Sequence, residues 1–216
     1  GGIKLRQSSA ILYDKDECPF CWKVRLALAI KALEVEHITI DTENKPADFL
    51  ALSPNGKVPL LTSNGELISE SSVIIETLEC WQPKPTLLGM SPQERERIAT
   101  LNHYSDTVIG PAIRDAIFTQ RGRPSSQWDM DAIEQSKRKW RDCLAWLNNH
   151  FEPSDPLHPV FFSSFSLAEC ALLPRFALAS AYGLHQSREF PELQRWFDYH
   201  RQHPYFVTTA PAIFSD

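Results

Sequence analysis

Two cysteines spaced three residues apart form the motif with the clearest chemistry in this chain, Cys18-Pro19-Phe20-Cys21. The motif follows a short apolar segment, Ile11-Leu12-Tyr13. Two thiols at the start of a helix are typical of thiol–disulfide exchange, because the attacking species is a thiolate and a helix N-terminus stabilises negative charge. Pro19 suits the first helical position, where a missing N–H costs nothing. We predict that Cys18 is the nucleophile at or near the N-cap and that Cys21 is more shielded.

The same spacing is also half of a zinc site, but a closed structural site needs four ligands. The remaining cysteines, Cys80, Cys143 and Cys170, stand far apart. The one close histidine pair, His200 and His203, fits the polar face of a late helix. The spacing and the preceding strand therefore favour redox chemistry, and we predict no metal site.

Three acidic residues, Asp14, Asp16 and Glu17, stand just before Cys18. Nearby negative charge disfavours a thiolate, whereas Lys15 and the helix dipole oppose that effect. Either the acids point to solvent or Cys18 is less acidic than is usual for such a thiol. The sequence leaves both interpretations open.

Composition limits the class of protein. The chain has 216 residues, of which 43% are hydrophobic and 23% charged, as in an ordinary globular protein. The net charge of -5 argues against a general nucleic-acid surface, and no apolar run is long enough to span a membrane. Five cysteines without a regular framework fit a reducing compartment, so we expect a cytoplasmic protein.

The elements that must position the thiols follow from hydrophobic periodicity and turn signals. A first domain, residues 1–81, has the pattern β-α-β-α-β-β-α, with strands at about 10–13, 35–40, 58–61 and 67–68 and helices at about 19–33, 46–52 and 71–79. A linker at about 82–91 is rich in proline. A second domain, residues 92–216, is predicted to be all-helical, with helices at about 92–118, 127–151, 166–179 and 191–200 and a kink or break at Gly110-Pro111.

Four separated motifs carry a resemblance to a known family. They are Cys18-Pro19-Phe20, Asn55-Gly56-Lys57-Val58-Pro59-Leu60, Glu70-Ser71 followed by Val73, Ile74 and Ile75, and the capping box Ser166-Leu167-Ala168-Glu169. In order and spacing, the chain resembles the cytosolic glutathione transferase superfamily, and within it the cysteine-type, omega-like branch. Cys21 is a departure, because it gives a C-P-F-C motif like that of dithiol glutaredoxins.

The resemblance implies a fold and a set of site residues. It implies a thioredoxin-like α/β domain followed by an all-α domain, with glutathione as cosubstrate. Cys18 would be catalytic and Cys21 a possible resolving thiol. The residues implied for binding glutathione are Phe20, Lys45, Lys57, Val58, Pro59, Glu70 and Ser71. Lys45, or Lys57 in its place, would receive the glycyl carboxylate, Val58 the cysteinyl backbone, and Glu70 with Ser71 the γ-glutamyl end.

The function implied is a glutathione-dependent thiol transferase that reduces disulfides, mixed disulfides or dehydroascorbate. Two alternatives remain open: conjugation of glutathione to electrophiles, and a non-enzymatic regulator on the same fold. The expected partners are glutathione, a small-molecule or protein disulfide, and a second copy in a homodimer. Tyr104, Arg114, Phe118 and Trp128 are weaker candidates for the substrate side, since aromatic residues at helical spacing are usually core.

Overall fold

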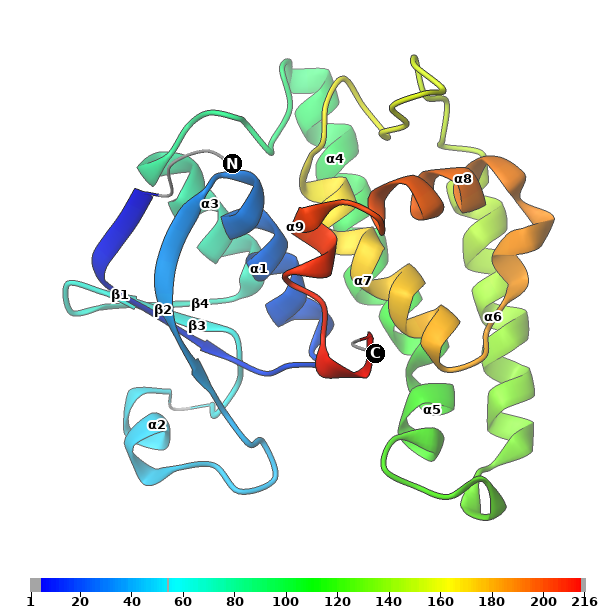
Figure 1. Cartoon of the computed structure of the whole chain (residues 1–216), viewed down its shortest axis with the longest axis horizontal. Helices are drawn as coiled ribbons and strands as arrows, with labels where there is room; N and C mark the ends of the chain where they lie inside the picture. Colours follow the sequence, from blue (N-terminus) through cyan, green and yellow to red (C-terminus); the bar gives the residue numbers. More distant parts are fainter. Residues whose placement is uncertain (1–4, 54, 215–216) are drawn as a thin grey trace. The chain divides into compact units, whose positions relative to one another are not determined.

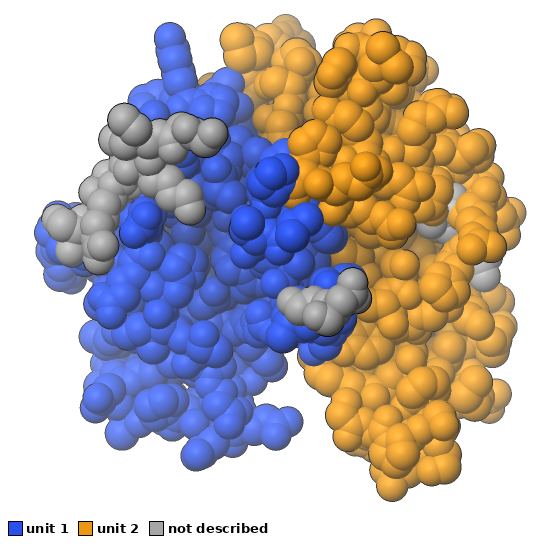
Figure 2. Space-filling view, viewed as in Figure 1, with its two compact units in different colours: residues 1–87, 204–216 blue, residues 88–203 orange. Residues whose placement is uncertain are grey.

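The structure is a computed structural model and describes residues 5–53 and 55–214. The chain divides into two compact units, residues 1–87 with 204–216 and residues 88–203 (Figure 2). The first unit is built on a four-stranded sheet and the second is helical, which confirms the predicted fold class. The predicted second domain ran from 92 to 216, whereas the described residues from 204 to 214 group with the first unit.

The first unit has the expected order of elements (Figure 1). Its elements are β1 (Leu5–Asp14), α1 (Pro19–Ile30), β2 (Leu33–Thr39), α2 (Ala47–Leu52), β3 (Leu60–Ser63), β4 (Glu66–Ser69) and α3 (Ser71–Trp81). The strand order is β2-β1-β3-β4, with β1 parallel to β2 and antiparallel to β3. This arrangement puts the carboxyl end of β1, and the loop that carries the thiols, in the middle of the sheet.

Helices cover both faces of this sheet. Phe49 of α2 packs with Ile40 and Leu60, and Tyr13 adds to that cluster. Because side chains alternate along a strand, the neighbouring residue Leu12 points to the opposite face, where α1 and α3 pack together. Figure 1 shows α2 apart from the α1–α3 pair. The sheet is therefore covered by apolar side chains on both faces, and α1, which carries the thiol pair, packs on the face opposite α2.

The end of α1 differs from the prediction. The periodicity predicted a helix to residue 33, but α1 ends at Ile30, and β2 begins at Leu33. Ala32 between them has φ 52°, the left-handed conformation that usually needs glycine. Lys31 fixes this junction, because its buried ammonium bonds the carbonyl oxygens of Gln82 and Pro85 at 2.6 and 2.7 Å.

The second unit consists of helices. They are α4 (Pro92–Tyr104), a π-helix (Ser105–Ile109), α5 (Gly110–Gln120), α6 (Met130–Asn148), α7 (Leu167–Ala181) and α8 (Pro191–His200), with 3-10 turns at Ser125–Gln127 and Gln186–Glu189. Side chains cap three of these helices, namely Ser91 for α4, Asp129 for α6 and Ser166 for α7. The predicted capping box of Ser166 and Glu169 is confirmed.

The predicted kink at Gly110-Pro111 is a π-turn that keeps the helix continuous. Pro111 has no N–H to give to the preceding turn, and the irregular hydrogen bonding lies just before it, in Ser105–Ile109. A Cβ on Gly110 would lie 3.1 Å from the guanidinium of Arg175. Arg175, buried on α7, also donates to Ser105 Oγ at 3.3 Å. Gly110 thus makes room for a buried arginine that crosses between helices.

The C-terminal segment completes the first unit. It contains α9 (Pro204–Val207) and a 3-10 turn at Ala212–Phe214, and α9 contacts α1 (Figure 1). No helix in the described part of the chain has the length and apolar character needed to cross a membrane.

Candidate active site

The predicted nucleophile lies where the sequence placed it. Cys18 is the N-cap of α1, with φ −76° and ψ 121°, and Pro19 follows in the first turn. Its side chain makes no capping hydrogen bond, and it is partly exposed. The first helical bond runs instead from Trp22 N–H to the Cys18 carbonyl at 2.9 Å. The sulfur therefore stands at the positive end of the helix dipole, where a thiolate is stabilised.

The second thiol is different in environment. Cys21 is fully buried one turn into the helix, and neither cysteine is in a disulfide. Burial raises the pKa of Cys21, and the hydrogen bond and charge of Cys18 raise it further. Cys21 therefore keeps its proton, whereas Cys18 is the thiol that a reagent can reach.

The acidic residues before Cys18 are held by specific partners. Asp14 is buried, and its Oδ1 accepts from Arg25 Nη1 at 2.7 Å. Burial raises the pKa of Asp14, but the bonds to His37 and Arg25 outweigh it, so the pKa lies below its usual range. Asp16 is exposed, and its carboxylate accepts from the Ala212 N–H at 2.8 Å. Asp14 therefore does not point to solvent, because it is buried and paired with Arg25. The lower acidity of Cys18 stays a prediction.

Residues 55–59 lie in the loop before β3. The Val58–Pro59 peptide bond is cis, as the resemblance implied, and Gly56 has φ 63°. Asn55 Oδ1 accepts from the backbone N–H of Lys57 at 3.1 Å. A Cβ on Gly56 would lie only 3.0 Å from Lys45 Nζ, so the Lys45 side chain lies over this glycine. Lys45 is half-buried there, whereas Lys57 is exposed.

Glu70 and Ser71 begin α3. Glu70 occupies the N-cap with φ 70° and ψ 119°, a conformation that costs a non-glycine residue about 1–3 kcal/mol. Its side chain is exposed and makes no capping bond. Ser71 is buried as the first helical residue. The left-handed Glu70 therefore stands directly before the first turn of α3, with its carboxylate exposed.

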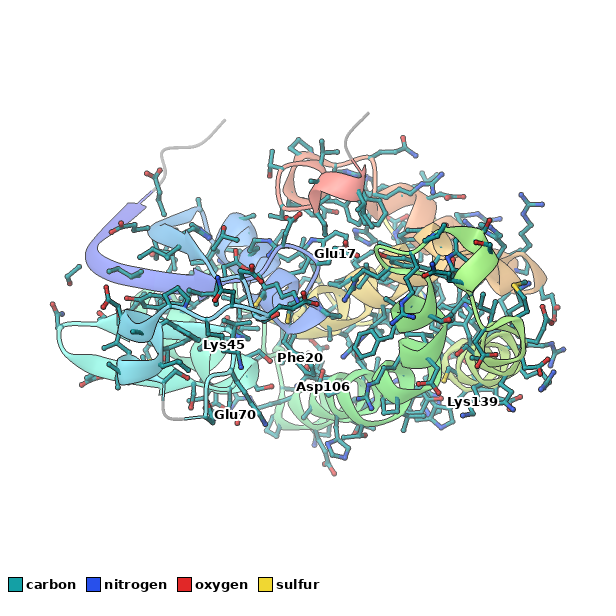
Figure 3. All side chains as sticks on the ribbon, turned by 90° about the horizontal axis from the view of Figure 1, so that it is seen from below. Glu17, Phe20, Lys45, Glu70, Asp106 and Lys139 are labelled. Atoms are coloured by element: carbon teal, nitrogen blue, oxygen red, sulfur yellow. The ribbon has the colours of Figure 1, made fainter. Side chains whose placement is uncertain are left out.

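The predicted site residues all belong to the first unit. Phe20 lies at the start of α1, Lys45 lies shortly before α2, and Glu70 stands directly before α3; all three are labelled in Figure 3. Lys23 Nζ lies 5.5 Å from the centre of the Phe20 ring. Sequence reasoning missed Arg25, although its position seven residues after Cys18, two turns along one helix face, was a usable signal.

The weaker substrate-side candidates lie in the second unit. Tyr104 stacks on Trp146 at 3.9 Å between ring centres and lines a pocket of about 470 Å³ with Cys143. Burial raises the pKa of Tyr104, and its interaction with Cys143 adds to the shift. Phe118 is 58% exposed, and the Trp128 indole donates to the carbonyl of Arg123, so these two do not join that pocket. Arg114 is exposed on α5.

Within the described ranges, no three or more histidine, cysteine or acidic side chains are grouped so that they could hold a metal ion. The candidate site consists of the two thiols, polar groups at the starts of α1 and α3, and the loops that precede Cys18 and β3. The first unit has a thioredoxin-like sheet with a thiol pair at a helix N-terminus, and a helical unit follows it. This is the architecture that the resemblance to glutathione transferases implied.

Comparison with known proteins agrees with this class. A model of the glutathione S-transferase N-terminal domain matches residues 12–86, and one of the C-terminal domain matches residues 130–198. Glutathione S-transferase U6 of Arabidopsis thaliana is 34% identical over 186 residues, which cover 82% of this chain and 78% of the relative. A maleylacetoacetate isomerase of Pseudomonas aeruginosa is 28% identical over 201 residues, which cover 88% of this chain and 91% of the relative.

A solved glutathione S-transferase of Methylobacterium radiotolerans, in complex with glutathione sulfonate, is 25% identical with a TM-score of 0.76 and covers 95% of both chains. The chain belongs to the glutathione S-transferase family. It is accordingly an enzyme of the glutathione transferase class with glutathione as cosubstrate. These relatives do not single out the omega-like branch, which stays a prediction.

Proposed function

We propose that this protein is a glutathione-dependent thiol transferase that works through a mixed disulfide between Cys18 and glutathione. The observation that carries the proposal is the asymmetry of the thiol pair. Cys18 is partly exposed at the N-cap of α1, and Cys21 is fully buried with a raised pKa. A thiol in the nucleophile's place favours capture of glutathione as a disulfide over activation of its thiol.

The proposed reaction has two displacement steps. The Cys18 thiolate attacks the glutathionyl sulfur of a mixed disulfide, forms the Cys18–glutathione disulfide and releases the substrate as a thiolate, which takes a proton from water. A second glutathione thiolate then attacks the glutathionyl sulfur, releases glutathione disulfide and returns Cys18 as a thiolate. In a second route, the Cys21 sulfur attacks the Cys18 sulfur and passes its proton to the departing glutathione thiolate, and two further glutathione molecules reduce the resulting Cys18–Cys21 disulfide and leave as glutathione disulfide.

Glutathione binding is proposed from charges and backbone groups. Lys45, which lies over Gly56, would bind the glycyl carboxylate in preference to Lys57, because Lys57 is exposed. Glu70 would bind the α-amino group of the γ-glutamyl end. The α-carboxylate of the γ-glutamyl end would accept hydrogen bonds from backbone N–H groups at the start of α3, beside Ser71.

Two further residues complete the proposed binding set. The backbone of Val58, next to Pro59, would pair with the cysteinyl part of glutathione, as the family resemblance implies. Phe20 would supply an apolar contact beside the reacting sulfur atoms. The alanine variants Lys45→Ala and Lys57→Ala separate the two lysines, since only the first should raise KM for glutathione several-fold.

Intact-mass spectrometry after exposure to oxidised glutathione tests the proposal. We expect one glutathione on Cys18, mapped by peptide digestion and removed by reduced glutathione. Cys18→Ser should lose both the adduct and turnover of mixed disulfides. Cys21→Ala should keep glutathione-driven turnover, and a loss there would contradict the first route. An unmodified Cys18 in the wild-type protein would sink the proposal.

A maleylacetoacetate isomerase activity that uses glutathione is a second candidate, because the Pseudomonas aeruginosa relative is named maleylacetoacetate isomerase and is similar over most of this chain. Conjugation to electrophiles is a further alternative, and it would use the glutathione thiol as the nucleophile. Assays with a cis-configured diacid and with an aromatic electrophile separate these from disulfide reduction. Cys18→Ser should abolish disulfide reduction and leave isomerisation and conjugation. Loss of all three activities would contradict a role of Cys18 limited to disulfide exchange.

We further propose a homodimer in a reducing compartment such as the cytoplasm. The five cysteines are free thiols, which fits that redox environment. The dimer is proposed from the family resemblance. Sedimentation at several concentrations tests it, and a monomer at every concentration would refute it.

A further inference from the structure

Arg25 of α1 ties together the loop that leads to Cys18. Its Nη1 donates to Asp14 Oδ1 at 2.7 Å and to the Lys15 carbonyl at 3.1 Å. Its Nη2 donates to the Asp16 carbonyl at 2.7 Å, and its Nε donates to the Thr209 carbonyl at 3.0 Å. The Arg25 side chain is only 10% exposed. One guanidinium thus binds a carboxylate and three backbone carbonyls around the residues before the nucleophile.

The C-terminal segment holds this arrangement from the other side. The Trp22 indole donates to Thr209 Oγ1 at 3.0 Å and packs on Phe206 with ring centres 5.2 Å apart. The Ala212 N–H donates to Asp16 Oδ2 at 2.8 Å. The Thr209 carbonyl that receives Arg25 Nε is therefore fixed by its own side chain and by the turn that follows.

We propose that Arg25 is a positioning residue for Cys18: its charge offsets the buried Asp14 carboxylate, and its planar fork fixes the β1–α1 loop. The inference rests on the proposed function in one respect, that Cys18 is the nucleophile. A lysine at position 25 cannot fully replace Arg25. An ammonium group lacks the planar set of donors that lets one guanidinium bind a carboxylate and several carbonyls in different directions.

The electrostatic field of Asp14 reaches the thiol pair. The negative charge of Asp14 already contributes to the raised pKa of Cys21, so its field acts on the thiol pair. His37 is a second partner of Asp14, at 3.4 Å, but it is 42% exposed and is charged only when protonated. Arg25 is therefore the permanent cation on Asp14.

Other charged residues stand on the same loop and helix. Those of the loop are Lys15, Asp16 and Glu17, and α1 adds Lys23. They are unchanged in variants of Asp14 and Arg25. A comparison among such variants therefore isolates the Arg25–Asp14 pair.

The test is the pH dependence of Cys18 alkylation by iodoacetamide without glutathione, with the Cys18 peptide quantified by mass spectrometry. We expect Arg25→Gln to raise the pH midpoint of alkylation by about half a unit to one unit. The double variant Arg25→Gln with Asp14→Asn should return the midpoint toward wild type, because both charges are gone. Arg25→Lys should give an intermediate shift. An unshifted midpoint in Arg25→Gln, or no return in the double variant, would overturn the inference.

Two controls keep the test decisive. If Arg25→Gln does not fold, as judged by circular dichroism, Asp14→Asn alone should lower the midpoint, and an unchanged or raised midpoint there would refute the electrostatic role. A loosened loop without the charge effect would change alkylation rates equally at every pH. Because no glutathione is present, a failure of glutathione to modify Cys18 would refute the proposed function and leave this measurement standing.

Discussion

The buried carboxyl group of Glu169 gives a stability prediction that can be worked out from the structure. Glu169 is 0% exposed at the start of α7. Its Oε2 accepts from the Phe161 N–H at 3.0 Å and from the Trp196 indole N–H at 3.1 Å, and its Oε1 accepts from the Ser166 N–H at 3.0 Å. Replacing Glu169 with alanine leaves these three buried donors without their acceptor.

The expected loss follows from the number of donors. Each buried donor left unsatisfied costs about 1–3 kcal/mol, so Glu169→Ala should lower the free energy of unfolding by at least about 3 kcal/mol. Ser166→Ala is the matched control, because it removes one capping hydroxyl and should cost about 1 kcal/mol. It should also leave the chemistry of Cys18 unchanged, since Ser166 acts in folding.

Urea unfolding followed by circular dichroism measures both variants against the wild type. A loss in Glu169→Ala no larger than that in Ser166→Ala would refute the reasoning. If Glu169→Ala does not fold, Glu169→Gln is measured in its place. Its loss in free energy of unfolding should lie between the loss expected for Glu169→Ala and that of Ser166→Ala. Its amide keeps one acceptor oxygen and turns an NH₂ group toward the remaining donors.

The same carboxyl group makes stability depend on pH. Burial raises the pKa of Glu169 to about 7, against the lowering effect of its hydrogen bonds, from an ordinary value of 4.5. Between these two values the unfolded chain releases the proton and the folded protein keeps it, so the free energy of unfolding falls as pH rises. The loss totals about 3 kcal/mol and levels off above pH 7. Wild type measured against Glu169→Gln should show this fall between pH 4.5 and 8, and a flat or rising difference would contradict it.

Two further predictions concern the first unit. Lys31→Ala removes the ammonium that pairs with Glu79 at 2.7 Å in a buried position; it should lower the free energy of unfolding by about 3 kcal/mol in urea, and a loss under 1 kcal/mol would show that the pair contributes little. Gly56→Ala places a Cβ 3.0 Å from Lys45 Nζ and should raise KM for glutathione several-fold. Gly65→Ala is the control, because Gly65 also has positive φ but nothing within 4 Å of its Cβ; an equal KM in both variants would remove Lys45 from the binding site.

Much of the first unit could be predicted because its signals are local. The N-cap position of Cys18 followed from Pro19 and from the strand before it, and the order of strands and helices followed from periodicity and turns. The end of α1 could not be predicted, because Ala32 adopts a left-handed conformation that nothing in its own sequence signals. The carbonyl groups that fix this junction come from Gln82 and Pro85, about fifty residues later.

The electrostatics of the site were beyond local reasoning for the same reason. The sequence showed acids before Cys18 but not that Arg25 and His37 would bind one of them. Nor could it show that Thr209, far along the chain, would accept from Arg25. Long-range pairs depend on how the sheet and the C-terminal segment meet, and a single sequence carries no pattern for that contact.

The pairing of Trp22 with Thr209 has a consequence for how the protein is made. The two residues are 187 positions apart, with the whole helical unit between them. At a synthesis rate of 5–20 residues per second, the segment that covers Trp22 emerges about 10–40 s after it. During that interval the indole of Trp22 and the guanidinium of Arg25 lack their later partners. The sheet unit can therefore reach its final packing only after the helical unit has been translated, so the thiol site is among the last parts of the nascent chain to be completed.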